Sequence, residues 1–316
     1  MDKKFNNLKD ATGPIPYGLR NDYMFRAVFQ ESKEALKGLL CSILHFNEDD
    51  IKSIVVCNPI ELGKNINGKD YVLDLKIMFN DNTIVNIEMQ VINKGNWPER
   101  SLSYLCRNFD NLNKGTDYMD VKTAIHIGFI NFTLIENCPE FCATYLMKNA
   151  KNDNVYSSKF ILKVVELNNT KLATEEDKYY GIDRWAQLFK AATWEEIKMY
   201  AANNKAMENV VNKVFEYNSE ETMRDICRAR EESIAYQMFM DNRAKEMEQN
   251  LIKMEDELEE KKKQLVRQNE QIAEQNEQII NKDEQLIRQK QKLEEKEQEL
   301  LLAKKLIEEL QAKVQE

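Results

Sequence analysis

Asp74 and Glu88 are the residues of this sequence whose type and spacing most clearly suggest chemistry. They lie in residues 70–91, where apolar and polar residues alternate on both sides of the turn-forming residues 80–82. This pattern predicts a β-hairpin. If the turn is centred on Asp81, Asp74 and Glu88 lie directly opposite each other on one face of the hairpin. Like charges in this position destabilise a sheet unless something compensates for them, and a divalent cation is the usual compensation.

Two carboxylates that bind Mg²⁺ could support phosphodiester hydrolysis. This cation prefers one or two protein carboxylates together with water and phosphate oxygens, and it can activate a water and neutralise charge on a phosphate. Gln90 follows Glu88 by two residues on the same face, so its amide could orient the attacking water. Lys76 shares this face and could contact a phosphate or pair with a carboxylate. The simpler interpretation of these residues is an ordinary solvated face of a sheet.

Composition narrows the class of protein. The 316 residues carry a net charge of −9, which argues against a protein that coats nucleic acid through an overall basic surface. The chain has two histidines and six cysteines without CxxC spacing, so neither a structural zinc site nor a histidine base is expected. The cysteines are typical of reduced thiols in a cytosol. No secretory signal and no apolar run of about 20 residues is present, so we expect a cytoplasmic protein with no membrane partner.

The residue pattern predicts an α/β protein with a mixed sheet flanked by helices. The first predicted elements are two helices, which begin with a cap at Asn21 or Asp22 and end near Leu44. A strand over residues 51–60 and the hairpin come next, followed by a helix from Pro98 to about Leu112. Strands over residues 121–132 and 160–167 then precede helices from about 175 to 240. We expect four parts: an N-terminal arm (1–19), a core (20–170), a helical subdomain (171–240) and a coiled coil (241–316).

The last part of the chain has a heptad pattern. Ten apolar residues follow one another at a spacing of seven: Leu251, Leu258, Leu265, Ile272, Ile279, Leu286, Leu293, Leu300, Ile307 and Val314. If these are d positions, Asn269 and Asn276 fall at a, which favours a homodimer in fixed register through residues 251–314. The alternative is a single charged helix that pairs only weakly with itself, since the remaining a positions are mostly charged.

Several short segments of the sequence resemble those of one protein family. In order, they are Asn21-Asp22-Tyr23-Met24-Phe25 with Phe29, residues 36–44, Asn58-Pro59, Leu73-Asp74-Leu75-Lys76, Asn86-Ile87-Glu88-Met89-Gln90, Arg100-Ser101-Leu102-Ser103-Tyr104 and Gly115-Thr116-Asp117-Tyr118. Together they make the chain similar to the PD-(D/E)xK nuclease family transposases, also called recombination-promoting nucleases. The resemblance covers about residues 20–240, and its most specific part is the segment 86–90.

This resemblance implies a restriction-endonuclease-like core that cleaves DNA with Mg²⁺, or with Mn²⁺ in its place. It assigns Asp74 as the metal-binding Asp and Glu88 as the acidic residue of the (D/E)xK pair. Gln90 stands where the wider superfamily often has Lys and where this family usually has Gln. A Glu on the first core helix also belongs to the superfamily pattern. Glu34 is its nearest match, although it lies opposite the apolar stripe of its helix.

Residues outside the hairpin have a functional and a structural interpretation. Arg100 and Tyr104 lie one helical turn apart and could approach the DNA backbone together with Arg107. Core packing is the alternative for Tyr104 and for Trp97. His126 lies inside an apolar strand and is expected to be a core histidine whose hydrogen bonds are satisfied.

The leading interpretation is a Mg²⁺-dependent DNA endonuclease that dimerises through its C-terminal helix, so that two sites act on two strands. The alternative is a catalytically inactive nuclease fold that binds DNA or a protein partner and serves as a coiled-coil scaffold. A third interpretation is an RNA-cutting toxin or defence factor on the same core.

Overall fold

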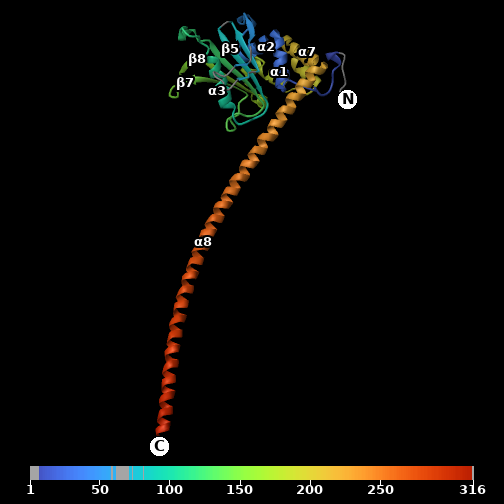
Figure 1. Ribbon diagram of the computed structural model, residues 1–316. Helices are drawn as coiled ribbons and strands as arrows, with labels where there is room; N and C mark the ends of the chain where they lie inside the picture. The colour runs from blue at the N-terminus through green and yellow to red at the C-terminus, as the bar shows by residue number, and fades with distance from the viewer. Residues whose placement is uncertain (1–6, 58–59, 62–70, 73, 81, 315–316) are drawn as a thin grey trace. The chain divides into compact units, whose positions relative to one another are not determined.

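The protein contains a six-stranded mixed sheet with helices on its faces (Figure 1). The computed structural model describes residues 7–57, 60–61, 71–72, 74–80 and 82–314. The strands lie in the order β1 (Ile54–Cys57), β4 (Leu75–Phe79), β5 (Thr83–Gln90), β6 (Thr123–Ile130), β8 (Val155–Glu166) and β7 (Cys142–Lys148). The central strands β5, β6 and β8 run parallel, and the other neighbours pair antiparallel. The predicted α/β class and mixed sheet are therefore confirmed.

The predicted hairpin is formed by β4 and β5. Leu75 lies opposite Ile87, and Phe79 lies opposite Thr83, which is the register that the alternation of the sequence predicts. The expected centre of the turn, Asp81, lies outside the described residues. Asp74 itself comes directly before β4, and the residues upstream include a short separate ladder between β2 (Ile60–Glu61) and β3 (Tyr71–Val72). The predicted single arm 71–79 is thus two strands.

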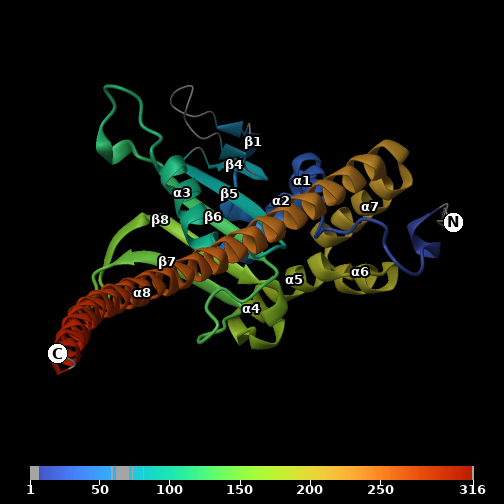
Figure 2. The ribbon, with the colours of Figure 1, turned by 60° about the horizontal axis from the view of Figure 1, so that its bottom comes forward.

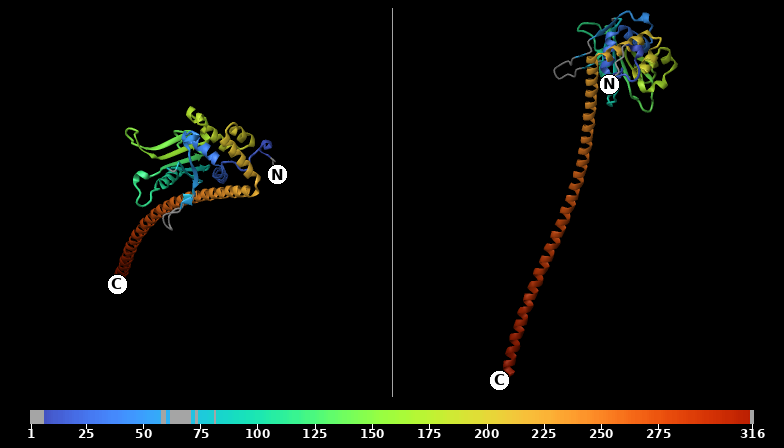
Figure 3. Two further views of the ribbon diagram at one scale, coloured as in Figure 1. Left: turned by 90° about the horizontal axis from the view of Figure 1, so that it is seen from above. Right: turned by 90° about the vertical axis from the view of Figure 1, so that its right-hand side faces the viewer.

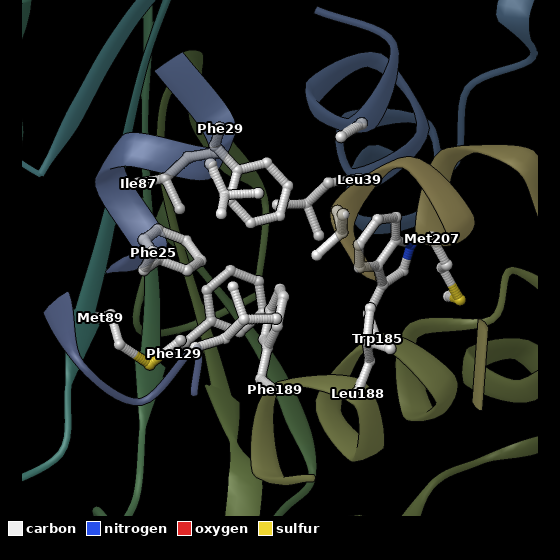
Figure 4. Close-up of a cluster of buried hydrophobic side chains, with 14 of the residues drawn as sticks. Phe25, Phe29, Leu39, Ile87, Met89, Phe129, Trp185, Leu188, Phe189 and Met207 are labelled. Carbon is white, nitrogen blue, oxygen red and sulfur yellow. The ribbon is translucent and has the colours of Figure 1, made fainter. Parts of the chain in front are cut away.

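One face of the sheet carries the main hydrophobic core (Figure 4). The helices that pack there are α1 (Asp22–Glu31), α2 (Lys33–Leu44), α5 (Ile182–Lys190) and α7 (Lys205–Ser219). Asn21 caps α1 as predicted, because its side chain accepts hydrogen bonds from the backbone of Tyr23 and Met24. Phe129 of β6 meets Phe189 of α5 edge to face, with ring centroids 4.9 Å apart. This contact packs α5 against β6.

The other face of the sheet is covered by α3 (Trp97–Phe109), which packs on β5, β6 and β8 (Figure 2). Pro98 stands in its first turn, as predicted. The indole of Trp97 lies directly on Gly128, where a Cβ atom would come within 2.0 Å of the ring, so this close approach requires glycine. All residues of β5 except Gln90 are buried. The interpretation of its polar face as solvated is therefore wrong, because α3 excludes water from it.

The first compact unit, Met1–Ala235, contains further helices. They are α4 (Glu175–Tyr179) and α6 (Trp194–Ala201), with 3-10 helices at Leu8–Asp10, Glu48–Asp50, Tyr118–Asp120 and Leu167–Leu172. Among them, α6 extends the same core through Trp194, Ile197 and Ala201. Trp185 and Phe189, expected in a helical subdomain, pack against Phe29 of α1. Residues 11–19 also contribute buried side chains, among them Ile15 and Leu19. The four-part division of the chain stays a prediction.

The chain ends in a single continuous helix, α8 (Glu221–Val314), most of which forms the second unit, Tyr236–Glu316 (Figure 3). The heptad residues at positions 251 to 307 are all exposed. The coiled coil that would cover them stays a prediction. In the part of the chain that the structure describes, no helix combines the length and the apolar character that crossing a membrane requires.

Candidate active site

The carboxylate of Asp74 is hydrogen-bonded to the last part of β5. Its Oδ2 accepts a hydrogen bond of 2.8 Å from the backbone N–H of Met89, the residue that follows Glu88 on β5. Burial, followed by the negative charge of Glu88, raises the pKa of Asp74 to about 8, while the hydrogen bond from Met89 acts in the opposite direction. The structure therefore brings Asp74 and Glu88 close enough for one charge to act on the other. The described ladder begins at Leu75 and Ile87, so the predicted cross-strand pairing of Asp74 with Glu88 stays a prediction.

Glu88 is a buried carboxylate, with 2% of its surface exposed. Its Oε1 accepts hydrogen bonds from Nε and Nη2 of Arg100 on α3, at 2.6 and 2.5 Å. Burial raises the pKa of Glu88, and the charge and hydrogen bonds of Arg100 act in the opposite direction. Because both N–H groups reach the same oxygen, Oε2 of Glu88 is left buried without a hydrogen-bond partner among the described residues.

Gln90 lies at the end of β5, on the same face of the strand as Glu88 and two residues beyond it. It is half-buried, and its Nε2 donates a hydrogen bond of 2.8 Å to the backbone oxygen of Ile92. This bond orients the amide, so that its oxygen is available to accept from a water. Its role in the reaction stays a prediction.

Glu34, the residue chosen for the first-helix carboxylate, is not brought to this pair. Its carboxylate lies between α2 and α7, where Oε1 is 2.7 Å from Nζ of Lys205 and Oε2 is 2.6 Å from Nδ2 of Asn209. These exposed contacts explain why an acidic residue stands opposite the apolar stripe of α2. We infer that Glu34 joins two helices at the surface.

Asp22, in the first turn of α1, is the helical carboxylate that acts on Asp74. Its negative charge raises the pKa of Asp74, whereas the positive charge of Arg26, one turn further along α1, lowers it. Asp22 is held by Arg230 of α8, whose Nε lies 2.9 and 2.8 Å from the two carboxylate oxygens. Sequence reasoning missed these three residues as parts of the site, although Asp22 belongs to the segment 21–25 that carried the family resemblance.

His126 of β6 lies opposite Asn86 of β5, close to Glu88, and is fully buried. Its Nδ1 is 2.8 Å from the side-chain nitrogen of Asn86, and its Nε2 is 3.9 Å from Oε2 of Glu88. Burial, together with the nearby charge of Arg100, lowers the pKa of His126 to about 3, so the ring is neutral at pH 7. The expectation of a satisfied core histidine is therefore only half right, because Nε2 has no hydrogen-bond partner among the described residues.

The aromatic residues of α3 pack in the interior. Trp97 and Tyr104 are 3% and 7% exposed, which supports core packing over contact with DNA. The ring of Tyr104 stacks on His126 with centroids 6.0 Å apart, and the guanidinium of Arg100 lies over the Tyr104 ring, 5.1 Å from its centroid. Lys76 lies opposite Asn86 in the ladder, as expected, and burial lowers its pKa. Glu88 is thus surrounded by packed side chains of α3 and by His126.

The donor set at this position fits a hard divalent cation. Two carboxylates lie close enough for their charges to interact, and one oxygen of Glu88 is buried without a partner among the described residues. Within the described ranges, no cluster of three or more His, Cys, Asp or Glu side chains could hold a metal. A pair of carboxylates is the donor set that Mg²⁺ uses when water and phosphate oxygens complete its shell.

Comparisons with known proteins identify a family. The family model described as PD-(D/E)XK nuclease family transposase matches residues 19–244, which include the whole sheet and the site. Comparison with curated proteins finds no match, and comparison with solved structures finds none either.

Proposed function

This chain belongs to the PD-(D/E)XK nuclease family transposases, and from this premise we propose that it is a Mg²⁺-dependent DNA endonuclease. The observation that carries the proposal is the position of Asp74 beside Glu88, where the charge of one carboxylate raises the pKa of the other. A metal-dependent nuclease needs two neighbouring carboxylates to bind its cation. In a protein that binds no cation there, the repulsion between the two carboxylates reduces the stability of the fold. Mn²⁺ is the other cation that the pair would accept.

Asp74 and Glu88 would hold the cation, which supplies an activated water and neutralises charge on the phosphate. The backbone N–H of Met89 orients Asp74, and Arg100 orients Glu88. Gln90 would position the attacking water through its amide oxygen, since an amide can accept a hydrogen bond but cannot act as a base. Arg100 would also present positive charge to the DNA backbone, because its side chain remains 37% exposed.

We assign the first-helix carboxylate of this site to Asp22. Its charge acts on Asp74, while Glu34 is paired with Lys205 on another part of the surface. Arg230 holds Asp22 in a fixed orientation through two nitrogen atoms. In this assignment Asp22 adds to the negative potential that attracts a cation to the pair.

The C-terminal helix would dimerise the protein. The heptad residues of α8 are exposed in the single chain, and a second α8 would cover them. A parallel pair would bring two nuclease units to one end of the helix pair, so the second unit would act at a high effective concentration on the same DNA.

A catalytically inactive scaffold is the second candidate, and one observation favours it. Arg100 already neutralises Glu88 within the protein, as a structural ion pair would. In that case the fold would bind DNA or a protein partner without cleaving it.

Incubation of the purified full-length protein with supercoiled plasmid, linear DNA and single-stranded RNA distinguishes these functions. Each substrate is tested with Mg²⁺ and with EDTA, beside Asp74→Ala and the exposed control Asp225→Ala. DNA cleavage that requires Mg²⁺ and Asp74 supports the proposal. DNA binding without cleavage indicates the scaffold, and cleavage of RNA alone indicates a ribonuclease.

A further inference from the structure

Beside Glu88, on β5 and β6, lies a polar pair, Asn86 and His126, that the proposed reaction does not use. Both residues are fully buried, and the rings of Trp97 and Tyr104 pack against the imidazole. Burying polar side chains among aromatic rings costs free energy unless their hydrogen bonds are made. Their presence here calls for a physical reason.

The contact between the two residues sets the tautomer of the histidine. The side-chain nitrogen of Asn86 lies 2.8 Å from Nδ1 of His126. An amide nitrogen can only donate, so Nδ1 must accept, and a neutral imidazole then carries its proton on Nε2. The ring therefore presents an N–H group on the side away from Asn86.

That N–H group faces the free oxygen of Glu88. Nε2 of His126 and Oε2 of Glu88 are 3.9 Å apart, and both are buried atoms without another hydrogen-bond partner among the described residues. A bridging water would hold the two atoms about 4.5 Å apart or more, since each of its hydrogen bonds is about 2.8 Å long. A direct hydrogen bond requires the two atoms to approach each other by about 1 Å.

We propose that His126 is a positioning residue for Glu88. Its Nε2–H holds the inner oxygen, Arg100 holds the outer oxygen, and together they fix the plane of the carboxylate relative to Asp74. The inference rests on the proposed function only in treating Glu88 as a metal ligand. Partners that orient a ligating carboxylate in this way change metal affinity by about 10- to 100-fold when they are removed.

The tautomer is tested first, because it requires neither metal nor DNA. The chain contains two histidines, so ¹⁵N-histidine labelling of the full-length protein gives two imidazoles, and His45→Gln identifies the remaining one as His126. We expect a neutral ring protonated at Nε2, whose nitrogen shift changes in Glu88→Gln and not in Glu34→Gln. Protonation at Nδ1, or no response to Glu88→Gln, overturns the inference.

Metal affinity then tests the role. We expect His126→Leu and His126→Asn to weaken Mn²⁺ binding by about 10- to 100-fold in calorimetry of the full chain. His126→Gln should stay close to wild type, because the Gln amide nitrogen reaches the position of Nε2 and the Asn amide reaches only that of Nδ1. His45→Gln is the matched control, since His45 stacks on Tyr180 at the end of α2.

The outcomes separate this inference from the function on which it rests. Wild-type affinity in all three His126 variants overturns the inference and leaves the nuclease proposal standing. A wild-type protein that binds no Mn²⁺ and cleaves no DNA overturns the proposed function, and the tautomer measurement still decides whether His126 holds Glu88. If His126→Leu does not fold, the contrast between His126→Gln and His126→Asn decides.

Discussion

Arg100 reaches from α3 to the centre of the sheet and binds Glu88 through two nitrogen atoms that meet the same carboxylate oxygen, at 2.6 and 2.5 Å. The pair neutralises a carboxylate that is otherwise isolated from water. It also leaves the second oxygen, Oε2, directed toward His126. The orientation of Glu88 therefore depends on α3 as much as on its own strand.

Replacing Arg100 is expected to destabilise the globular unit. Arg100→Gln leaves the Glu88 charge buried without its cation, which should cost roughly 2–3 kcal/mol in metal-free buffer at pH 7. Glu88→Gln combined with Arg100→Gln should recover most of this loss, because no unpaired charge remains. Urea unfolding followed by tryptophan fluorescence measures the change, since Trp97, Trp185 and Trp194 all lie in the first unit. Arg228→Gln, an exposed arginine of α8, is the control, and an equal effect of this control would contradict the interpretation.

Asp74 makes the stability of the metal-free protein depend on pH. Its pKa in the folded chain is about 8 because of burial and the charges of Glu88 and Asp22, with Arg26 acting in the opposite direction. An unfolded Asp ionises near pH ~4. Between these values the folded state binds more protons than the unfolded state, so stability falls as pH rises from about 4 to about 8.

In Asp74→Asn the side chain cannot ionise, so the part of the fall in stability that comes from Asp74 should be absent. In EDTA, the variant should gain stability over wild type as the pH rises toward about 8, measured as the difference in urea midpoint by tryptophan fluorescence. A difference that stays constant across this range would show that Asp74 does not titrate as described. Asp225→Asn, an exposed residue paired with Arg228, should follow the wild-type curve.

The sequence predicted the parts of the fold that depend on local patterns. Strict alternation and turn chemistry were sufficient to place Leu75 opposite Ile87, and a side-chain cap was sufficient to locate the start of α1 at Asn21. The strand β7 was missed because it is an edge strand with a mostly exposed surface, so its residues lack the apolar alternation that marks a half-buried strand.

The shell around the site could not be predicted in the same way, because it is assembled by tertiary contacts. Asp22 and Arg230 are 208 positions apart, and no local pattern connects them. The burial of Glu88 depends on α3, whose approach is set by the fit of Trp97 against Gly128. For Glu34, helical periodicity indicated only that the residue lies away from the core, and the structure supplies its partners on α7.

Gln90 is expected to contribute to turnover and not to DNA affinity. Gln90→Ala should slow cleavage by tens- to hundreds-fold, roughly 2–3 kcal/mol in the activation barrier, because the attacking water loses a hydrogen bond that orients it. Gln90→Lys, which introduces the residue common in the wider superfamily, should retain activity. Single-turnover cleavage and a parallel DNA-binding titration separate the two effects. An unchanged rate in Gln90→Ala would exclude Gln90 from the reaction.

The C-terminal helix is expected to set the oligomeric state. An isolated helix with a single apolar stripe has no core of its own, so the exposed heptad residues of α8 should pair with those of a second chain. Light scattering should give a homodimer for the full chain at micromolar concentration and a monomer for residues 1–240. A monomeric full chain would refute the coiled coil, and an equally dimeric truncation would move the interface into the first unit.

The central claim is that Asp74 and Glu88 together bind the cation that cleaves DNA. Its most direct test is the initial rate of plasmid cleavage as a function of Mg²⁺ concentration, measured for wild type, Asp74→Asn, Glu88→Gln and the matched control Glu34→Gln. The account predicts that Asp74→Asn and Glu88→Gln each abolish cleavage at every Mg²⁺ concentration, while tryptophan fluorescence shows that both variants remain folded. It also predicts that Glu34→Gln cleaves like wild type. Wild-type rates in both Asp74→Asn and Glu88→Gln would contradict it.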